Sequence, residues 1–322
     1  FALFGAELPV ARLVSALWGT LAVAALVPVA RRALGPSWAL AAVLAMAVFR
    51  WPLHFSNTIF RAVMPPLFIL LSVWFFLRWR EGRRPLDAVV CGAAFGTGLY
   101  TYTSFRLVPV MMGLWIVYQF SRGLLVWRRD ARAIAVVIVS AMVTVAPLSL
   151  HFARHPEHLT SRTGEISLLS RHGALKPPSE ILRAVAGNAR DIALMWTVRG
   201  DHVARHNLPH RPVFDWLTGV FFYAGLVWCV GRARREEFAF ICLAWILTLS
   251  CASLFSFGAP NLLRMQGMTP AVVLVLVFGL RWAWQMAAPL AGPAIRTAAV
   301  AALLGFFATM QLVDYFVRLS LI

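Results

Sequence analysis

The chain alternates about ten long apolar runs with mostly short polar connections. A helix that crosses a lipid bilayer needs about 20 apolar residues, because the hydrocarbon core is roughly 30 Å thick and each helical residue rises about 1.5 Å. The runs are continuous, which favours helices over the alternating strands of a membrane barrel. We therefore predict an all-α polytopic membrane protein with about ten transmembrane helices. The predicted spans lie near residues 10–30, 36–53, 62–78, 86–101, 105–120, 132–152, 213–230, 238–257, 268–285 and 294–317.

One long polar stretch, residues 153–212, interrupts this pattern. It separates six predicted spans in residues 1–152 from four in residues 213–322. Within it, apolar residues recur at roughly helical spacing near 179–196, and charged residues take most of the other positions. Ser179 follows two prolines and is a natural N-cap. We expect a large extracytoplasmic loop with an amphipathic helix that lies flat in the membrane interface or packs on the rest of the loop.

Composition agrees with a membrane protein and narrows its partners. Hydrophobic residues make up 60% of the chain, more than a water-soluble globule of this length can bury. The net charge of +17 would suggest nucleic acid in a soluble protein, but the basic residues lie in the connections between spans. We therefore expect no nucleic-acid partner. The four cysteines fall within predicted spans without a C-x-x-C pair, which indicates apolar fillers rather than disulfides.

Arginine in the connections predicts the orientation. Every other connection is rich in arginine, and such connections face the cytoplasm. The long loop then falls on the extracytoplasmic side together with His54, Arg106 and Arg264. All eight histidines lie on or near that side, so we expect the chemistry there.

The first polar motif of the loop is His155-Pro156-Glu157-His158. Two histidines three residues apart on a helix can bind a divalent metal, but Pro156 disfavours a regular helix unless it lies in the first turn. We expect solvated loop polarity here, with no resident metal or cofactor. A divalent metal is the alternative.

A second polar motif spans residues 200–209 and is dense in groups that hydrogen-bond sugars or phosphates. A carboxylate near histidines, such as Asp201, could act as a base or hold a ligand. Alternatively, the loop is stapled by its own polar side chains.

Three arginines occupy corresponding extracytoplasmic ends of predicted spans: Arg61, Arg106 and Arg264. An arginine that turns inward at a membrane is costly unless it pairs with an anion, and its guanidinium binds phosphate through two parallel hydrogen bonds. We expect the three to form a clamp for a lipid phosphate or pyrophosphate. Contact with phospholipid headgroups is the alternative.

Other reaction classes lack their signatures. The sequence has no Walker loop, no G-x-S-x-G and no H-E-x-x-H. Acidic residues are nearly absent from the spans, with Asp314 near the end of the last one. Ion-coupled transporters usually need such residues at mid-membrane, so this absence weakens a transporter interpretation.

Six stretches in this order resemble bacterial C-type membrane glycosyltransferases, and most of all glycosyltransferase family 39. This protein-mannosyltransferase-like group includes the aminoarabinose transferases of lipid A. The resemblance implies transfer of a sugar from a polyprenyl-phosphate donor to a lipid or protein acceptor at the outer membrane face. It also implies that the loop falls between the family's seventh and eighth helices. The stretches are FGAELPVARLVSALWG, WPLHFSNTIFRAVMPPLF, GTGLYTYTSFRLVP, HPEHLTSRTGEIS, GDHVARHNLPHRPVFDWLTGVFFYAGL and APNLLRMQGMTP.

The resemblance suggests roles for individual residues. The three arginines would stabilise charge on the departing lipid phosphate. Two tyrosines would line the lipid or sugar, and polar residues of the second motif would hold sugar or acceptor hydroxyls. Asp201 and Glu165 are weaker catalytic candidates. The tyrosines are Tyr100 and Tyr102, and the hydroxyl-binding residues are His202, His206 and Asn207.

Two features depart from the family pattern. The family's acidic residue, proposed as catalytic base, lies in the first outer loop, which would precede Phe1. Because the chain starts without methionine at the edge of a span, we expect an N-terminally truncated protein that could be inactive as this fragment. Asn57 stands where related sequences often have arginine, which removes one expected phosphate contact.

Together these observations predict a hexosyl- or pentosyltransferase in the bacterial inner membrane, with its active face extracytoplasmic. Its expected partners are a polyprenyl-phosphate-linked sugar, a lipid or protein acceptor and membrane lipids. The alternatives are a transporter or flippase of lipid-linked sugars and a non-catalytic membrane assembly subunit.

Overall fold

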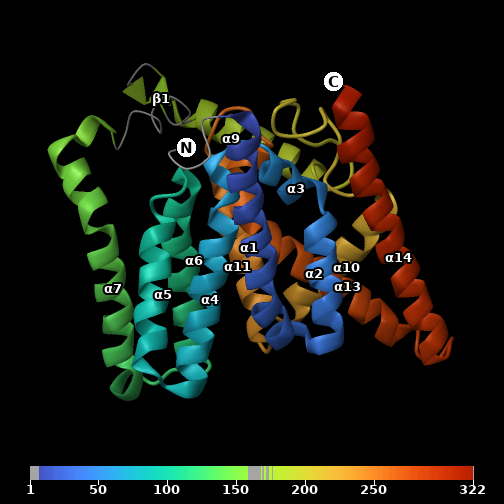
Figure 1. Cartoon of the computed structure of the whole chain (residues 1–322), viewed down its shortest axis with the longest axis horizontal. Coiled ribbons are helices and arrows are strands. Elements are labelled where there is room, and N and C mark those ends of the chain that lie inside the picture. The colour runs from blue at the N-terminus through green and yellow to red at the C-terminus, as the bar shows by residue number, and fades with distance from the viewer. Residues whose placement is uncertain (1–6, 159–167, 169, 172–173, 176, 322) are drawn as a thin grey trace.

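The chain folds into a bundle of long helices (Figure 1), in a computed structural model that describes residues 7–158, 168, 170–171, 174–175 and 177–321. The elements of the first half are α1 (Leu8–Leu34), α2 (Pro36–Val48), α3 (Arg50–Asn57), η1 (Arg61–Val63), α4 (Pro65–Gly82), α5 (Pro85–Gly98), η2 (Thr103–Leu107), α6 (Val108–Ser121) and α7 (Trp127–Arg154). The elements that follow are β1 (Ser170–Arg171), β2 (Ala174–Leu175), α9 (Pro178–Leu194), α10 (Trp216–Arg232), α11 (Glu237–Leu254), α12 (Leu262–Met265), η3 (Gln266–Met268), α13 (Thr269–Met286), α14 (Pro293–Val313), η4 (Asp314–Arg318) and η5 (Leu319–Leu321).

Proline sets the start of most of these helices. Eight of the described helices have a proline in their first turn, where its missing N–H costs no helical hydrogen bond. Gly35 joins α1 to α2 with φ of 81°, a backbone conformation that residues with a Cβ rarely adopt. The boundaries between helices therefore follow from residue types that are visible in the sequence.

The helical fold is confirmed, but ten continuous spans are not. Within the described residues, six helices are long and apolar enough to cross a membrane, or seven if the bent pair α2 and α3 counts as one span. That pair turns by 50° between Val48 and Arg50. Helices α5 and α6 have 14 residues each and α10 has 17, so each is shorter than a span of about 20 residues. The prediction rested on the lengths of apolar runs, and these lengths do not show where the backbone turns.

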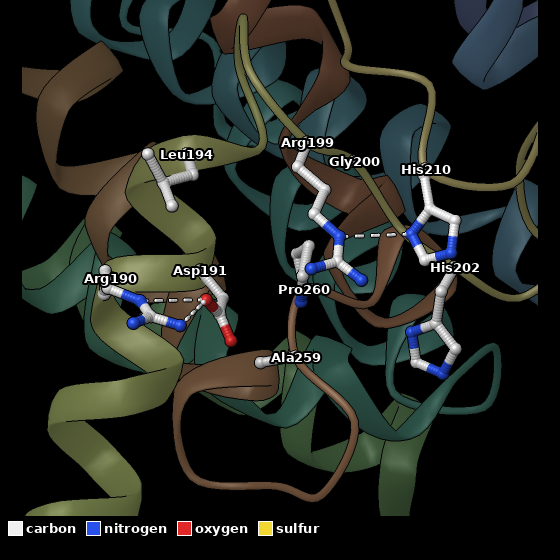
Figure 2. Close-up of a pocket in the computed structure, with 9 residues that line it drawn as sticks. All are labelled: Arg190, Asp191, Leu194, Arg199, Gly200, His202, His210, Ala259 and Pro260. Atoms are coloured by element: carbon white, nitrogen blue, oxygen red, sulfur yellow. Dashed lines mark hydrogen bonds and ion pairs between the residues drawn. The ribbon is translucent and has the colours of Figure 1, made fainter.

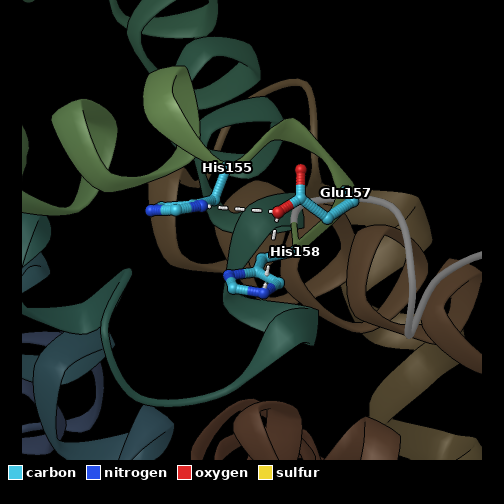
Figure 3. Close-up of side chains that lie close together, drawn as sticks. All are labelled: His155, Glu157 and His158. Atoms are coloured by element: carbon cyan, nitrogen blue, oxygen red, sulfur yellow. Dashed lines mark ion pairs between the residues drawn. The ribbon is translucent and has the colours of Figure 1, made fainter.

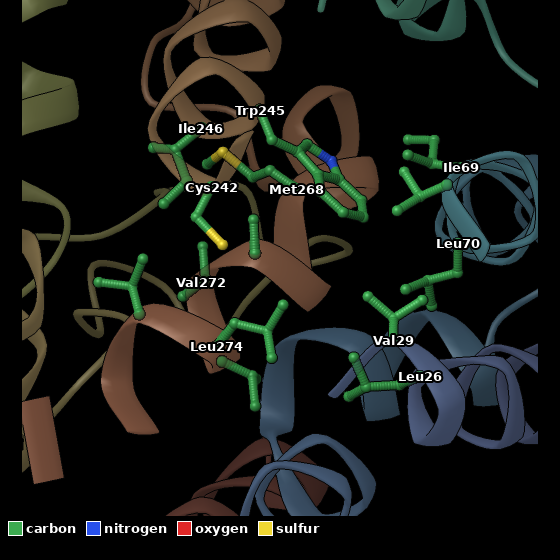
Figure 4. Packing of buried hydrophobic residues seen from close by; sticks show 14 of the residues in the cluster. Leu26, Val29, Ile69, Leu70, Cys242, Trp245, Ile246, Met268, Val272 and Leu274 are labelled. Carbon is green, nitrogen blue, oxygen red and sulfur yellow. The ribbon is translucent and has the colours of Figure 1, made fainter. Parts of the chain in front are cut away.

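Helix α13 forms the centre of the bundle. Every residue from Thr269 to Leu280 is buried, as expected for a helix that is apolar on all sides. Figure 4 shows the surrounding side chains, which come from α1, α4 and α11. Helix α10 packs closely on α13 through two glycines, because a Cβ on Gly225 would lie 1.9 Å from the Val275 carbonyl oxygen. Glycine lets the two backbones approach, a common feature of membrane helix pairs.

Helices α7 and α14 lie at opposite edges of the bundle (Figure 1). Only 6% of the apolar window of α7 and 17% of that of α14 is buried. The contact of α7 with α5 again depends on glycine, since a Cβ on Gly92 would lie 2.2 Å from the Val137 carbonyl oxygen. The outward faces of α7 and α14 are apolar, which suits contact with lipid chains.

One end of the bundle, here termed the loop end, carries α3, α9, the two short strands and residues 195–215 (Figure 1). The strands form an antiparallel hairpin, a small exception to the predicted all-α class. Helix α9 lies in the segment where we predicted an amphipathic helix, but it starts at Pro178, so Ser179 is in its first turn and is not the N-cap. The Asn188 amide fastens α9 to the bundle by donating to the carbonyls of Leu254 and Ser256, each at 2.9 Å. Its position flat in a membrane interface stays a prediction.

Candidate functional site

A polar cavity of about 240 Å³ lies at the loop end, here termed the loop pocket. Three segments that are distant in sequence build it: η2, the loop after α9, and the turn that leads into α12. The described residues that line it include two arginines and two histidines but no aspartate or glutamate. They are Tyr102, Thr103, His202, Val203, Arg205, His206, Phe257, Gly258, Asn261, Leu263 and Arg264.

The two arginines enter the loop pocket from different segments. Asn261 caps the first turn of α12, where its side chain accepts a hydrogen bond from the Arg264 backbone N–H. The Arg264 guanidinium donates to the Phe257 carbonyl at 2.7 Å and to the Ser256 hydroxyl. Arg205 is exposed, and its carbonyl lies 2.8 Å from Nε2 of the buried His54. Since the described lining residues include two cations and no acid, this cavity suits an anion.

Asp201 and His206 form a buried pair, of which His206 lines the loop pocket and Asp201 does not. Asp201 is fully buried, and its carboxylate accepts hydrogen bonds from the backbone N–H groups of Val203 and Leu262, both at 2.9 Å. Its Oδ2 lies 3.3 Å from Nδ1 of His206. These contacts tie the loop to α12, which matches the alternative in which the loop is stapled by its own side chains. The hydrogen-bonding capacity of the Asp201 carboxylate is therefore used within the protein. To act as a base, the carboxylate would have to lose some of these hydrogen bonds.

The other ring nitrogen of His206 is different. His206 is 3% exposed, and its buried Nε2 has no hydrogen-bond partner among the described residues. Its ring packs against Phe55 and Phe60, with centroids 6.4 and 6.2 Å away. A buried polar atom without a partner is costly, so Nε2 is a candidate for a bond with a bound molecule.

Asn207 stabilises the turn in the loop after α9. It is buried, and its amide donates to the carbonyls of Arg211 at 2.8 Å and Asp201 at 3.2 Å. Gly200 lies so close to this turn that a Cβ there would be 2.0 Å from the Arg211 carbonyl oxygen. Asn207 thus shapes the loop, and it is not among the residues that line the pocket.

A second cavity of about 170 Å³ adjoins the first (Figure 2). His202, which is exposed, lines both cavities. Figure 2 shows the Arg199 side chain reaching His210, with Nε 3.3 Å from the ring Nδ1. Arg190 pairs with Asp191 at 3.1 Å on the opposite wall. The loop end therefore offers two neighbouring polar cavities that share one histidine.

The three arginines predicted as a clamp line different surfaces. Arg264 lines the loop pocket. Arg61 is exposed beside an apolar groove of about 210 Å³ between η1 and α1. The Arg106 guanidinium lies 5.6 Å from the ring of Phe152 on α7. The structure does not bring the three into one pocket, because η1 faces α1 whereas Arg106 is directed to α7.

The two tyrosines predicted to line the lipid or sugar also lie at different sites. Tyr102 lines the loop pocket together with His202 and His206. The Tyr100 hydroxyl instead donates to the Thr144 carbonyl on α7 at 2.9 Å, so it belongs to the contact between α5 and α7. Glu165 lies outside the described residues.

A buried ion cluster next to the loop was missed by the sequence reasoning. Asp314 is 1% exposed and accepts from three arginines: Arg50 at 2.8 Å, and Arg211 and Arg318 at 2.6 Å each. The cluster joins the bend between α2 and α3, the end of the loop and the last turns of the chain. Arg50 and Asp314 are 264 residues apart in the sequence, so their contact depends on the tertiary fold and is not visible in a local pattern.

Comparison with known proteins agrees with this architecture. Residues 1–151 match the family model described as dolichyl-phosphate-mannose-protein mannosyltransferase. ArnT from Cupriavidus metallidurans in the apo state is similar over 96% of this chain, with 19% identity and a TM-score of 0.51. The structure of that ArnT bound to undecaprenyl phosphate is similar over 99% of this chain, with 18% identity and a TM-score of 0.57.

The predicted resemblance to a membrane glycosyltransferase family is confirmed over residues 1–151 by the family model, and the two ArnT structures share the fold of this chain. The chain spans 57% and 59% of the length of the two ArnT chains. No curated protein matches the sequence.

Proposed function

We propose that this protein transfers a sugar from a polyprenyl-phosphate donor to a lipid or protein acceptor at the extracytoplasmic face of the bacterial inner membrane. The observation that carries the proposal is the loop pocket at the end of an apolar bundle. Its described lining residues include two arginines and no aspartate or glutamate. The family match of residues 1–151 and the fold shared with an ArnT that binds undecaprenyl phosphate support it.

Arg264 and Arg205 are the residues that we assign to the donor phosphate. In the reaction, the bond between the anomeric carbon and the phosphate oxygen breaks while the acceptor oxygen bonds to that carbon. Negative charge then collects on the departing lipid phosphate, and guanidinium groups fixed in advance stabilise it. Arg264 is held in place by Ser256 and Phe257, so little ordering is needed when the phosphate arrives.

The apolar groove between η1 and α1 is our candidate for the prenyl chain. Phe60 lines this groove, and its ring also packs on His206 of the loop pocket, so one aromatic layer separates the two cavities. Arg61 lies at the edge of the same groove. In this arrangement Arg61 lies beside the prenyl units nearest the phosphate, while Arg264 and Arg205 hold the phosphate that leaves.

We assign the sugar and acceptor hydroxyls to the polar wall that contains Tyr102, His202 and His206. Nε2 of His206 is buried and has no partner in the described part of the chain, and a hydroxyl group would satisfy it. Asp201 orients this ring through Nδ1 and acts as a positioning residue. Since Asp201 is satisfied by two backbone N–H groups and no acid lines the pocket, the base that takes the acceptor proton is not assigned among the described residues.

The test is transfer activity of the full-length protein in membranes, with labelled polyprenyl-phosphate pentose and hexose donors. Arg264→Ala should lower transfer about 100-fold or more, by analogy with the loss of a preorganised anion-stabilising group. Arg234→Ala is the matched control, because this arginine lies in the short connection between α10 and α11, far from the loop pocket in sequence and not among its lining residues.

Release of free polyprenyl phosphate separates the proposed enzyme from a flippase. A transferase releases it in proportion to glycosylated acceptor. Movement of intact lipid-linked sugar between leaflets, without release, would overturn the proposal in favour of transport. Unchanged transfer by Arg264→Ala would remove the assignment of the loop pocket.

A further inference from the structure

Three histidines and a glutamate gather at the loop-end tip of α7, separate from the loop pocket. His151 lies in the last turn of α7, and Pro156 begins a new helical turn after a break at His155. The backbone N–H of His155 donates to the His151 carbonyl at 2.9 Å, and that of His158 donates to the His155 carbonyl at 3.1 Å. This turn brings the three imidazole rings together, with centroids 5.1 to 5.3 Å apart.

The donor atoms of this cluster converge on one point (Figure 3). Oε1 of Glu157 lies 3.4 Å from Nδ1 of His155 and 3.8 Å from Nε2 of His158. One donor atom from each of the three residues lies within 4.8 Å of the others. In a tetrahedral zinc site with bonds of about 2.0–2.1 Å, neighbouring donors are roughly 3.3–3.5 Å apart. The side chains therefore need only small movements to surround an ion.

His151 supplies a second observation that points to a metal. Its Nε2 lies 3.1 Å from Nδ1 of His158, the ring nitrogen that does not face Glu157. Histidines that ligate a metal usually hydrogen-bond through their other ring nitrogen, which fixes the tautomer and orients the ring. His158 thus has both the ligating geometry and the outer partner of a metal-bound histidine.

We propose that His155, Glu157 and His158 bind one divalent transition metal of the zinc class, with His151 as the outer partner. Two imidazoles and a carboxylate suit zinc and its neighbours better than magnesium or calcium, which prefer oxygen ligands. Three protein ligands leave a fourth position for water or an added ligand. The metal would fasten the first turn after α7 to the end of that helix.

The test uses the purified chain in detergent after chelator treatment, titrated with zinc and followed by calorimetry. We expect one zinc per chain. Glu157→Gln and His158→Ala should each weaken binding at least ~10-fold, and His151→Ala should weaken it about 10-fold, as loss of an outer-shell partner does. His210→Gln is the matched control, since this exposed histidine belongs to the loop end but not to the cluster.

Cobalt(II) provides a second readout, because its visible absorption distinguishes tetrahedral from octahedral coordination. A tetrahedral spectrum in the wild type that the His155→Ala/His158→Ala double variant loses would support the site. The substituted residues are exposed, so the variants should keep the wild-type elution volume and thermal melting. Absence of stoichiometric zinc in the wild type, or equal affinity in the double variant, would overturn the proposal.

Discussion

Two histidine-rich segments at the loop end have similar residues but very different surroundings. In residues 200–210, Asp201, His206 and Asn207 are buried. Apart from Nε2 of His206, their side-chain polar atoms have partners in the loop itself and in α12. In residues 151–158, the side chains of His155, Glu157 and His158 are more than half exposed, and their partners among the described residues are one another and His151. Residue type alone made both segments candidates for chemistry. Burial and partners separate a loop that builds a pocket wall from a turn that is free to take an ion.

This comparison predicts the largest stability loss at the buried cluster that anchors the first segment. Asp314→Ala would leave Arg50, Arg211 and Arg318 without their shared carboxylate. Breaking a buried ion pair in this way costs about 3–5 kcal/mol of unfolding free energy. Thermal unfolding of the purified protein in detergent, followed by tryptophan fluorescence, measures the loss.

Glu81→Ala is the control for that experiment, because the Arg32–Glu81 pair has the same charges but 27% and 52% side-chain exposure, against 3% and 2% for Arg50 and Asp314. It should change stability by less than about 1 kcal/mol. Equal losses for the two variants would contradict the view that burial gives the Asp314 cluster its importance.

A smaller but substantial loss is expected from Asp201→Ala. The variant leaves the buried Leu262 backbone N–H unsatisfied, whereas the part-buried Val203 N–H can bond to water instead. A hydrogen bond to a charged group contributes about 1.5–3 kcal/mol, so the expected loss is of this size. Hydrogen exchange should accelerate over residues 199–211 and not over residues 151–158. Acceleration in both segments would show that the two are coupled.

The helix cap next to the first segment gives a third, weaker effect. Asp215 accepts hydrogen bonds from the Thr218 backbone N–H at 2.9 Å and the Thr218 hydroxyl at 2.7 Å, and so caps α10. Asp215→Ala should cost about 1 kcal/mol, whereas Asp215→Asn should restore most of it. Melting temperatures of the two variants measure this difference, and identical values would argue against the cap.

The smallest effect belongs to the exposed segment in the absence of metal. The His155→Ala/His158→Ala double variant should change unfolding free energy by no more than about 0.5 kcal/mol, as exposed substitutions usually do. Melting after chelator treatment tests this. A loss comparable to that of Asp201→Ala would mean that the turn after α7 is part of the packed core.

Much of the fold could be predicted from the sequence, because apolar runs and prolines mark helices locally. The central position of α13 could not, since α7 and α13 are both apolar runs and only tertiary contacts make one buried and the other peripheral. The bend between α2 and α3 and the shortness of α5 and α6 also depend on packing. Ten apolar runs in the sequence therefore do not correspond to ten long continuous helices in the described residues.

The candidate site was predicted in part. Tyr102, His202, His206 and Arg264, which the sequence singled out, line one pocket. The arginine pattern places their segments on one side of the membrane. Arg205, which also lines the pocket, lies in the polar motif of residues 200–209 but was not predicted as a phosphate-binding residue. The directions of the side chains of Arg61, Arg106 and Tyr100 could not be predicted, since they depend on neighbours from α1 and α7.

Native mass spectrometry of this chain with polyprenyl phosphate tests the central assignment most directly, with Arg264→Ala compared against Arg106→Ala. If the loop pocket holds the lipid phosphate, Arg264→Ala should weaken binding at least ~10-fold, a change of about 1.4 kcal/mol, while Arg106→Ala should bind like the wild type. Wild-type affinity in Arg264→Ala, or an equal loss in both variants, would contradict the account.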